Sequence, residues 1–191
     1  MEEIEVKFLN IDPEAIQKKL AEIGAKKVGE YFYRRRVFDY PDWRLNTKGA
    51  WLRLRDEGEK ITLTFKQRLG IEAHDGSAND GGMQEVEIIV SDFDRTAELL
   101  LALGFVEKFY QENTRVRWIK DNIEFDLDTW PGLNPYLEIE TKSWEEVDHA
   151  IQLLGLNPAD KKVFSTNQIY QLNGIDELSY KRIAFDGFVK R

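Results

Sequence analysis

Apolar and charged positions alternate strictly in several short stretches of this 191-residue chain. In the first stretch, Ile4, Val6 and Phe8 alternate with Glu5 and Lys7. Because successive side chains of a strand point to opposite faces, this alternation predicts strands with one apolar and one charged face. The same pattern recurs at residues 51–55, 61–67, 84–90, 114–119, 123–128 and 136–140.

Amphipathic helices are predicted between several of these strands. Three helices each have a predicted N-terminal capping side chain. The cap is Asp12 in the first helix, Ser91 or Asp92 in the second, and Ser143 in the third. Each helix is expected to end at a glycine: Gly24, Gly104 and Gly155, in the same order. A short fourth helix is predicted over residues 166–172. Residues 70–82 have almost no large apolar side chains and are predicted to form a long hairpin connection.

The alternation also indicates how the strands are arranged. Parallel strands that alternate with helices are buried on both faces and have continuous apolar runs, which this chain lacks. We therefore expect an α+β fold with a closed or nearly closed antiparallel β-barrel of about eight strands. The helices need apolar surface to cover, so they are expected to pack outside the barrel. The charged faces would then line a tunnel.

The length fits one domain with a core of its own. We expect residues 1–174 to form this domain and residues 175–191 to be its C-terminal tail. The chain has two histidines and no cysteine, which excludes disulfides, thiolate metal sites and a histidine-rich metal centre.

The overall charge of −8 argues against binding to nucleic acids or to anionic membranes, because both need a basic surface. The acidic N-terminus and the lack of an apolar run long enough to span a membrane predict a soluble, cytoplasmic protein. A homodimer is compatible with the sequence.

The polar faces of the predicted strands carry nine acids and six bases, a net charge of −3. The acids are Glu3, Glu5, Glu85, Glu87, Glu124, Asp126, Asp128, Glu138 and Glu140, and the bases are Lys7, Arg53, Arg55, Lys66, Arg115 and Arg117. Buried charges require partners, so a ligand is expected to complete the set. Carboxylates suit Mg²⁺ or Mn²⁺, while arginine and lysine suit phosphate. Two divalent ions would make the lining attractive to a polyphosphate.

These motifs resemble those of the CYTH superfamily, the triphosphate tunnel metalloenzymes. The superfamily includes class IV adenylate cyclases, thiamine triphosphatases and inorganic triphosphatases. Glu3-Ile-Glu-Val-Lys7 resembles the Glu-x-Glu-x-Lys signature. The other matches, in order, are Leu52-Arg-Leu-Arg55, Thr64-Phe-Lys66, Glu85 with Glu87, Arg115, Asp128, Glu138 with Glu140, and Lys162, with Lys161 as its alternative. The resemblance extends over about residues 1–174.

The resemblance implies a role for each of these positions, with Mg²⁺ or Mn²⁺ as the cofactor, expected as two ions. The implied metal ligands are Glu3, Glu5, Asp128, Glu138 and Glu140. The implied substrate-binding residues are Lys7, Arg53, Arg55, Lys66, Arg115 and Lys162. Glu5, Lys66 and Glu140 are expected to be catalytic. Further candidates for the site are Glu85, Glu87, Arg117, Asp126 and Trp51.

Three functions are compatible with this pattern. The first is hydrolysis of inorganic triphosphate or of a nucleoside or other organic triphosphate by a metal-activated water. The second is a class IV-type adenylate cyclase, in which the ribose 3′-hydroxyl of ATP attacks the α-phosphorus and pyrophosphate leaves. The third is a binding module for polyphosphate or nucleotides without turnover. The intact carboxylate set favours an enzyme, since phosphate binding alone needs only bases.

Two further observations concern aromatic and basic side chains. Trp51 matches a tryptophan of the mammalian thiamine triphosphatases, but Val37 stands where their tyrosine is expected, which favours inorganic or nucleoside triphosphates as substrates. Arg34 and Arg36 share one face of a predicted strand, either on the surface or in the tunnel.

Overall fold

The structure is a computed structural model, and it describes residues 4–68 and 83–191. Glu3 and the hairpin connection expected over residues 70–82 lie outside the described residues. The strands are β1 Ile4–Phe8, β2 Lys26–Asp39, β3 Ala50–Asp56, β4 Ile61–Arg68, β5 Met83–Val90, β6 Val106–Lys120, β7 Ile123–Thr129, β8 Tyr136–Thr141, β9 Tyr180–Ala184 and β10 Gly187–Lys190. The α-helices are α1 Pro13–Glu22, α2 Phe93–Ala102, α3 Trp144–Leu154 and α4 Thr166–Leu172, and short 3₁₀ helices are η1 Asn46–Lys48, η2 Pro158–Asp160 and η3 Glu177–Ser179.

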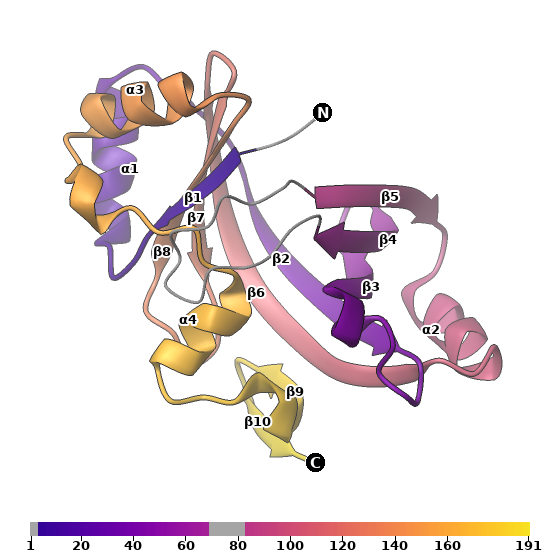
Figure 1. Cartoon of the computed structure of the whole chain (residues 1–191). Coiled ribbons are helices and arrows are strands. Elements are labelled where there is room, and N and C mark those ends of the chain that lie inside the picture. The colour runs from indigo at the N-terminus through magenta and orange to yellow at the C-terminus, as the bar shows by residue number, and fades with distance from the viewer. Residues whose placement is uncertain (1–3, 69–82) are drawn as a thin grey trace.

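One curved sheet contains all of these strands (Figure 1). Its main order is β1-β8-β7-β6-β2-β3-β4-β5, and every neighbouring pair on this path is antiparallel. The prediction of an α+β fold with an eight-stranded antiparallel path is therefore confirmed. β9 adds to β6 in parallel, and β10 pairs with β9.

The expected closure into a barrel is not found within the described residues, because β1 and β5 stand at opposite ends of the strand order. The outer edge of β1 is instead paired with the segment before α4 and not with β5. Lys7 and Lys162 exchange backbone hydrogen bonds of 2.7 and 2.9 Å. The segment before α4 therefore occupies part of the edge that a closing strand would need.

The apolar faces of the strands pack against the helices, as predicted. α1 and α3 lie side by side over the outer face of β1, β7 and β8 (Figure 1), where Phe125, Leu137 and Ile139 are fully buried. α2 covers the outer face of β2 and β3 around Phe38 and Leu54. The helices thus take up the apolar faces and leave the charged faces of the strands to face one another.

The predicted caps position these helices. Asp12, Asp92 and Ser143 each accept a hydrogen bond from a backbone N–H in the first turn of α1, α2 and α3, respectively. Asp92, rather than Ser91, is therefore the cap of α2. Gly24, Gly104 and Gly155 lie at or directly after the C-caps, as expected. None of the helices in the described part of the chain has the length and apolar composition needed to cross a membrane.

The C-terminal residues, which the sequence pattern left as a tail, form η3 and the β9–β10 hairpin. The hairpin is held against the body of the protein by side-chain contacts. Glu177 is buried and accepts hydrogen bonds from Gln111 on β6 and, at 2.7 Å, from Asn167 on α4. Phe188 of β10 packs on Gly132, so the last strand contacts the loop before β8.

Candidate functional site

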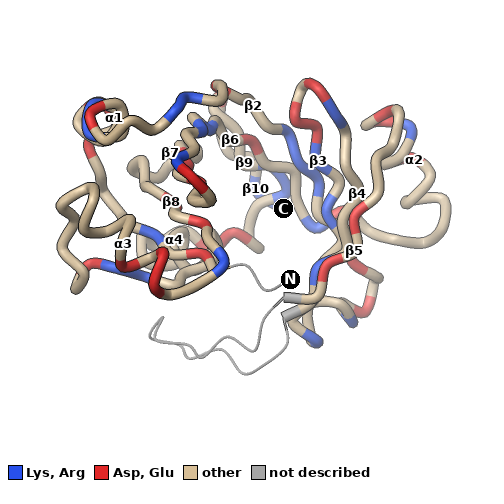
Figure 2. Tube along the Cα trace, turned by 90° about the horizontal axis from the view of Figure 1, so that it is seen from above, with Lys and Arg blue, Asp and Glu red and all other residues tan. Residues whose placement is uncertain are grey.

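The register of the strands brings charged side chains together on the concave side of the sheet. Lys7 on β1 lies opposite Glu138 on β8, which in turn lies opposite Asp126 on β7. On the other side of β2, Arg35 lies opposite Arg55 of β3. Directly paired residues point to the same face of a sheet, so these side chains form one surface, which we call the charged face. Figure 2 shows β7 and β8 on one side of the molecule and β3, β4 and β5 on the other, with many blue positions on β2 and β3.

A carboxylate triad lies on the β1–β8 side of the charged face. Oxygen atoms of Glu5, Glu138 and Glu140 lie within 4.8 Å of one another. Three carboxylate oxygens this close suit one small, hard cation such as Mg²⁺ or Mn²⁺. The triad brings together three of the five predicted metal ligands, and all three come from β1 and β8, which carry the first and the last of the three Glu-x-Glu motifs.

Lys7 lies beside this triad and is almost completely buried. Its ammonium contacts the carboxylate of Glu5 and lies 3.2 Å from an oxygen of Glu138. Burial opposes the ionisation of Glu138, but the charges of Lys7 and Arg115 outweigh it and lower the pKa of Glu138 to about 2. Glu138 is therefore a carboxylate at neutral pH, as a metal ligand must be.

Asp128, the fourth predicted metal ligand within the described residues, is not one of the three carboxylates of the triad. It accepts two hydrogen bonds from Arg115, of 2.7 and 2.6 Å. Arg115 also contacts Asp126 at 2.6 Å and Glu138 at 3.1 Å. The predicted roles of Asp128 as a metal ligand and of Arg115 as a phosphate ligand remain predictions, and both would require this network to rearrange.

Arg117 and Asp126, two further candidates, are engaged with each other. Arg117 donates two hydrogen bonds to Asp126, of 2.8 and 2.7 Å, and lies 2.9 Å from Glu124. Burial raises the pKa of Asp126, although both neighbouring arginines oppose that change. These ion pairs connect β6 with β7, the strand that pairs with β8 next to the triad.

A basic cluster formed by Arg35, Arg53, Arg55 and Lys66 lies on the β2–β4 side of the charged face. Arg55 donates a hydrogen bond of 2.8 Å to Glu57, and Lys66 lies 2.7 Å from Glu85. Arg53 differs from both, since no hydrogen bond or ion pair joins it to any described residue. Its Nε atom is buried without a partner.

The members of the basic cluster repel one another. The pKa of Arg53 is lowered by burial and by the nearby charges of Arg55 and Arg35. Burial, together with the charges of Arg55 and Arg115, lowers the pKa of Arg35 to about 10. Burial, together with the charges of Arg53 and Arg55, lowers the pKa of Lys66. An anion bound among these side chains would remove both the repulsion and the lack of hydrogen-bond partners.

Arg35 was not among the predicted site residues. The structure places Arg34 and Arg36 on the outer face, where both guanidinium groups lie 5.1 Å from the ring centroid of Phe93. Arg35 points to the charged face and stacks over Trp130 at 4.2 Å. Its Nε is also buried without a partner. The parity of β2 could have identified it, because Arg35 shares a strand face with Tyr33 and Val37, whereas Arg34 and Arg36 lie on the opposite face.

The remaining candidates are located as follows. Glu87 accepts a hydrogen bond of 2.8 Å from Thr64, and Glu85 pairs with Lys66 at the far end of the charged face. Trp51 is paired with Lys66 in the strand register, on the same side as Arg53. Lys162 lies beside Lys7 through its backbone. Its neighbour Lys161 packs outside, 5.0 Å from the ring centroid of Trp144, which favours Lys162 over Lys161 as the site lysine.

The protein is thus an α+β protein in which one curved sheet carries both acidic and basic side chains on its concave side. The CYTH domain profile matches residues 1–164 of the chain. The protein therefore belongs to the CYTH family, as its motifs indicated.

Among curated proteins, the chain is 26% identical over 154 residues to "Putative adenylate cyclase MJ0240" of Methanocaldococcus jannaschii, with 81% of this chain and 84% of that protein covered. The structure of PH1012 from Pyrococcus horikoshii aligns with a TM-score of 0.71 at 24% identity and covers 87% of this chain and 98% of that one. The structure of a Hippeastrum protein, named as a "putative adenylyl cyclase" that reveals a dominant triphosphatase activity, aligns with a TM-score of 0.60 at 17% identity. It covers 92% of this chain and 97% of that one. These structural matches show a shared fold.

Proposed function

We propose that the protein is a divalent-metal-dependent triphosphatase that binds its substrate along the charged face. The observation that carries this proposal is the pairing of a carboxylate triad with a basic cluster in which Arg35 and Arg53 each have a buried, unpartnered Nε. Carboxylates alone would bind a metal, and arginines alone would bind an anion. Both together, on one surface, suit a metal-bound polyphosphate.

Each group has a role in this proposal. Glu5, Glu138 and Glu140 would hold a divalent ion, which enzymes of the CYTH family typically use. Arg53 and Arg35 would donate hydrogen bonds to phosphate oxygens, with Arg55 and Lys66 adding positive charge. When bound, the metal would lower the pKa of a water molecule and neutralise phosphate charge.

The reaction proposed is an in-line displacement at the terminal phosphorus. The oxygen of water forms a bond to this phosphorus, and the bond to the bridging oxygen breaks. Diphosphate leaves with the electron pair of that bond, and the proton of the water passes to solvent. The basic cluster stabilises the negative charge that develops on the leaving diphosphate.

We further propose that β1 and β5 approach each other around the bound triphosphate and enclose it as a tunnel. The alternating strands and the covered outer faces support this arrangement. The backbone bridge between Lys7 and Lys162 would then form part of the wall.

The name of the Methanocaldococcus jannaschii relative favours a second candidate, adenylate cyclase. Both reactions use the same ion and phosphate ligands, so the products distinguish them. The Hippeastrum protein has a dominant triphosphatase activity despite its cyclase name, which supports hydrolysis as the first choice.

The deciding experiment incubates the purified chain with inorganic triphosphate or ATP, with Mg²⁺, with Mn²⁺ or with EDTA. We expect orthophosphate from inorganic triphosphate, in an amount that depends on the metal. Cyclic AMP together with pyrophosphate from ATP would replace the triphosphatase proposal with a cyclase. Absence of turnover with every substrate would contradict both.

A further inference from the structure

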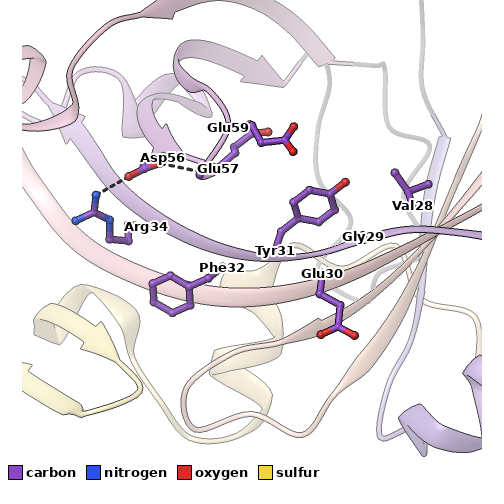
Figure 3. Close-up of a pocket in the computed structure, with 10 residues that line it drawn as sticks. Val28, Gly29, Glu30, Tyr31, Phe32, Arg34, Asp56, Glu57 and Glu59 are labelled. Carbon is purple, nitrogen blue, oxygen red and sulfur yellow. Dashed lines mark hydrogen bonds and ion pairs between the residues drawn. The ribbon is translucent and has the colours of Figure 1, made fainter.

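A hollow lies beside the charged face, between the first half of β2 and the turn that joins β3 to β4. Its volume is about 480 Å³, and Figure 3 shows the residues that line it. The ring of Tyr31 projects from β2 toward the turn, which carries Glu57 and Glu59, whereas Glu30 and Phe32 project from the opposite face of the strand (Figure 3).

A second hollow, of 360 Å³, shares Tyr31, Glu57 and Glu59 with the first. It extends to Tyr33 and Arg117, which belong to the charged face. Because they share lining residues, the two hollows form one recess that extends to Tyr33 and Arg117 of the charged face.

Two tyrosines form the floor of this recess. The rings of Tyr31 and Tyr33 are stacked, with centroids 5.8 Å apart and an interplanar angle of 28°. Gly29 allows Tyr31 to lie along the strand, because a Cβ atom at this position would stand 2.9 Å from the tyrosine hydroxyl oxygen. An aromatic ring held in place in this way offers a flat apolar surface to a ligand.

The stacked pair leads directly to the basic groups of the charged face. The ring centroid of Tyr33 is 5.2 Å from the guanidinium carbon of Arg55 and 6.0 Å from that of Arg115. Tyr33 is the next residue after Tyr31 on the same face of β2. A flat group stacked on Tyr31 would therefore lie close to the arginines that contact Tyr33 and that would bind the phosphates.

The rim of the recess offers hydrogen-bond acceptors. Glu57 is already engaged by Arg55. Glu59 is exposed and has no hydrogen-bond or ion-pair partner among the described residues. A free carboxylate next to an aromatic platform favours a ring that carries N–H donors, such as an exocyclic amine.

We propose that Tyr31 and Glu59 form a binding site for an amine-bearing purine, through which the protein distinguishes purine nucleoside triphosphates from inorganic triphosphate. The purine would stack on Tyr31 and donate a hydrogen bond from its amine to Glu59. This inference rests on the proposed function, since the phosphates of the same molecule would occupy the basic cluster.

The test compares ATP with inorganic triphosphate as substrates of the full chain. Tyr31→Ala should raise the KM for ATP about 10-fold or more, in keeping with the value of base–aromatic stacking, and leave the KM for inorganic triphosphate within about twofold. Tyr31→Phe should restore the wild-type KM for ATP. The matched control is Trp144→Ala, which removes a half-exposed aromatic ring on α3, far from the recess, and should change neither KM.

A second comparison tests the amine. Glu59→Gln should raise the KM for ATP more than the KM for purine riboside triphosphate, which lacks the exocyclic amine. Equal effects on these two nucleotides would overturn the role of Glu59. Equal effects of Tyr31→Ala on ATP and inorganic triphosphate, or an effect on neither, would overturn the purine site.

Binding measurements separate this inference from the proposed function. If the protein hydrolyses no triphosphate, the proposed function fails, and calorimetry with ATP and inorganic triphosphate in the presence of Mg²⁺ replaces the kinetic assay. Tyr31→Ala must then weaken the binding of ATP alone for the purine site to stand.

Discussion

At the scale of single residues, Arg53 combines a stability cost with a binding role. Its guanidinium lies among other cations, and no carboxylate of the described residues pairs with it. Burial and repulsion from Arg55 and Arg35 lower its pKa, so the folded protein holds this charge at a disadvantage. Such a charge is retained when a ligand compensates for it.

Arg53→Gln is therefore expected to change activity and stability in opposite directions. The loss of hydrogen bonds between a charged donor and phosphate should lower kcat/KM for inorganic triphosphate about 10- to 100-fold. The midpoint of urea denaturation without ligand should stay the same or rise. The matched control is Arg95→Gln on α2, whose side chain is 82% exposed and which should leave the activity unchanged. A destabilised Arg53→Gln protein with full activity would show that Arg53 is structural.

Glu138 makes stability depend on acid pH. Its pKa in the folded protein is about 2, below its ordinary value of 4.5, because Lys7 and Arg115 outweigh the effect of burial. A lowered pKa means that the carboxylate stabilises the fold above pH 4.5 and that this contribution disappears as the pH falls toward 2.

Glu138→Gln should lower the free energy of unfolding at pH 7, since Lys7 and Arg115 lose a charged partner. It should also reduce the loss of stability between pH 4.5 and pH 2, as measured by urea denaturation across that range. Glu98→Gln, on the exposed surface of α2, is the control. A Glu138→Gln protein with the wild-type slope against pH would contradict the assigned pKa.

The alternation of side chains between the two faces of a strand explains which site residues could be predicted from the sequence. The two Glu-x-Glu motifs that form the triad were visible because their spacing of two places both acids of each motif on one face. The spacing could not show that Arg115 would bind Asp128 and Asp126, since those contacts depend on rotamers and on the register between strands. Arg35 was missed because a run of three arginines contains both parities.

At the scale of elements, the caps, the glycine stops and the alternating strands were all predictable from local patterns. The β9–β10 hairpin was not. Its pairing with β6 is a contact between segments far apart in the chain, and the short strands lack a long alternating pattern. The expected closed barrel also depends on non-local pairing, between the first and fifth strands, which no local pattern specifies.

Gly132 tests the attachment of this hairpin. Its φ of 77° disfavours any other residue, and a Cβ atom would stand 2.8 Å from the Phe188 ring. Gly132→Ala should destabilise the protein by more than about 2 kcal/mol, because the backbone strain of about 1–2 kcal/mol adds to a clash with β10. The free energy of unfolding in urea measures this effect.

Gly58 provides the matched control for Gly132. Its φ is 87°, and nothing lies within 4 Å of the position of a Cβ atom. Gly58→Ala should therefore show the backbone strain alone. If both variants lost the same stability, the packing of Phe188 on Gly132 would contribute nothing.

At the scale of the whole molecule, the charged face connects two groups of strands with unlike charge. The triad belongs to β1 and β8, and the basic cluster belongs to β2, β3 and β4. A ligand that contacts both would join parts of the sheet that are distant in the strand order. Binding should therefore stabilise the folded state as a whole.

Inorganic triphosphate and Mg²⁺ together should raise the Tm more than either alone. At 100 times the dissociation constant, a ligand adds about 2.7 kcal/mol, which corresponds to about 5–10 °C for a chain of this size. Differential scanning calorimetry with Mg²⁺, with triphosphate and with both measures the shift, and Ca²⁺ can replace Mg²⁺ if turnover consumes the ligand. Equal shifts with and without metal would contradict a joint site.

The backbone bridge at Lys162 has a consequence for the behaviour of the chain in concentrated solution. An unpaired edge strand is a template on which another chain can add, and it promotes aggregation. Lys162 exchanges two hydrogen bonds with Lys7 and so shields the exposed side of β1 with the protein's own chain. The segment that leads into α4 thus hinders a second copy of the chain from adding a strand at this position of the β1 edge.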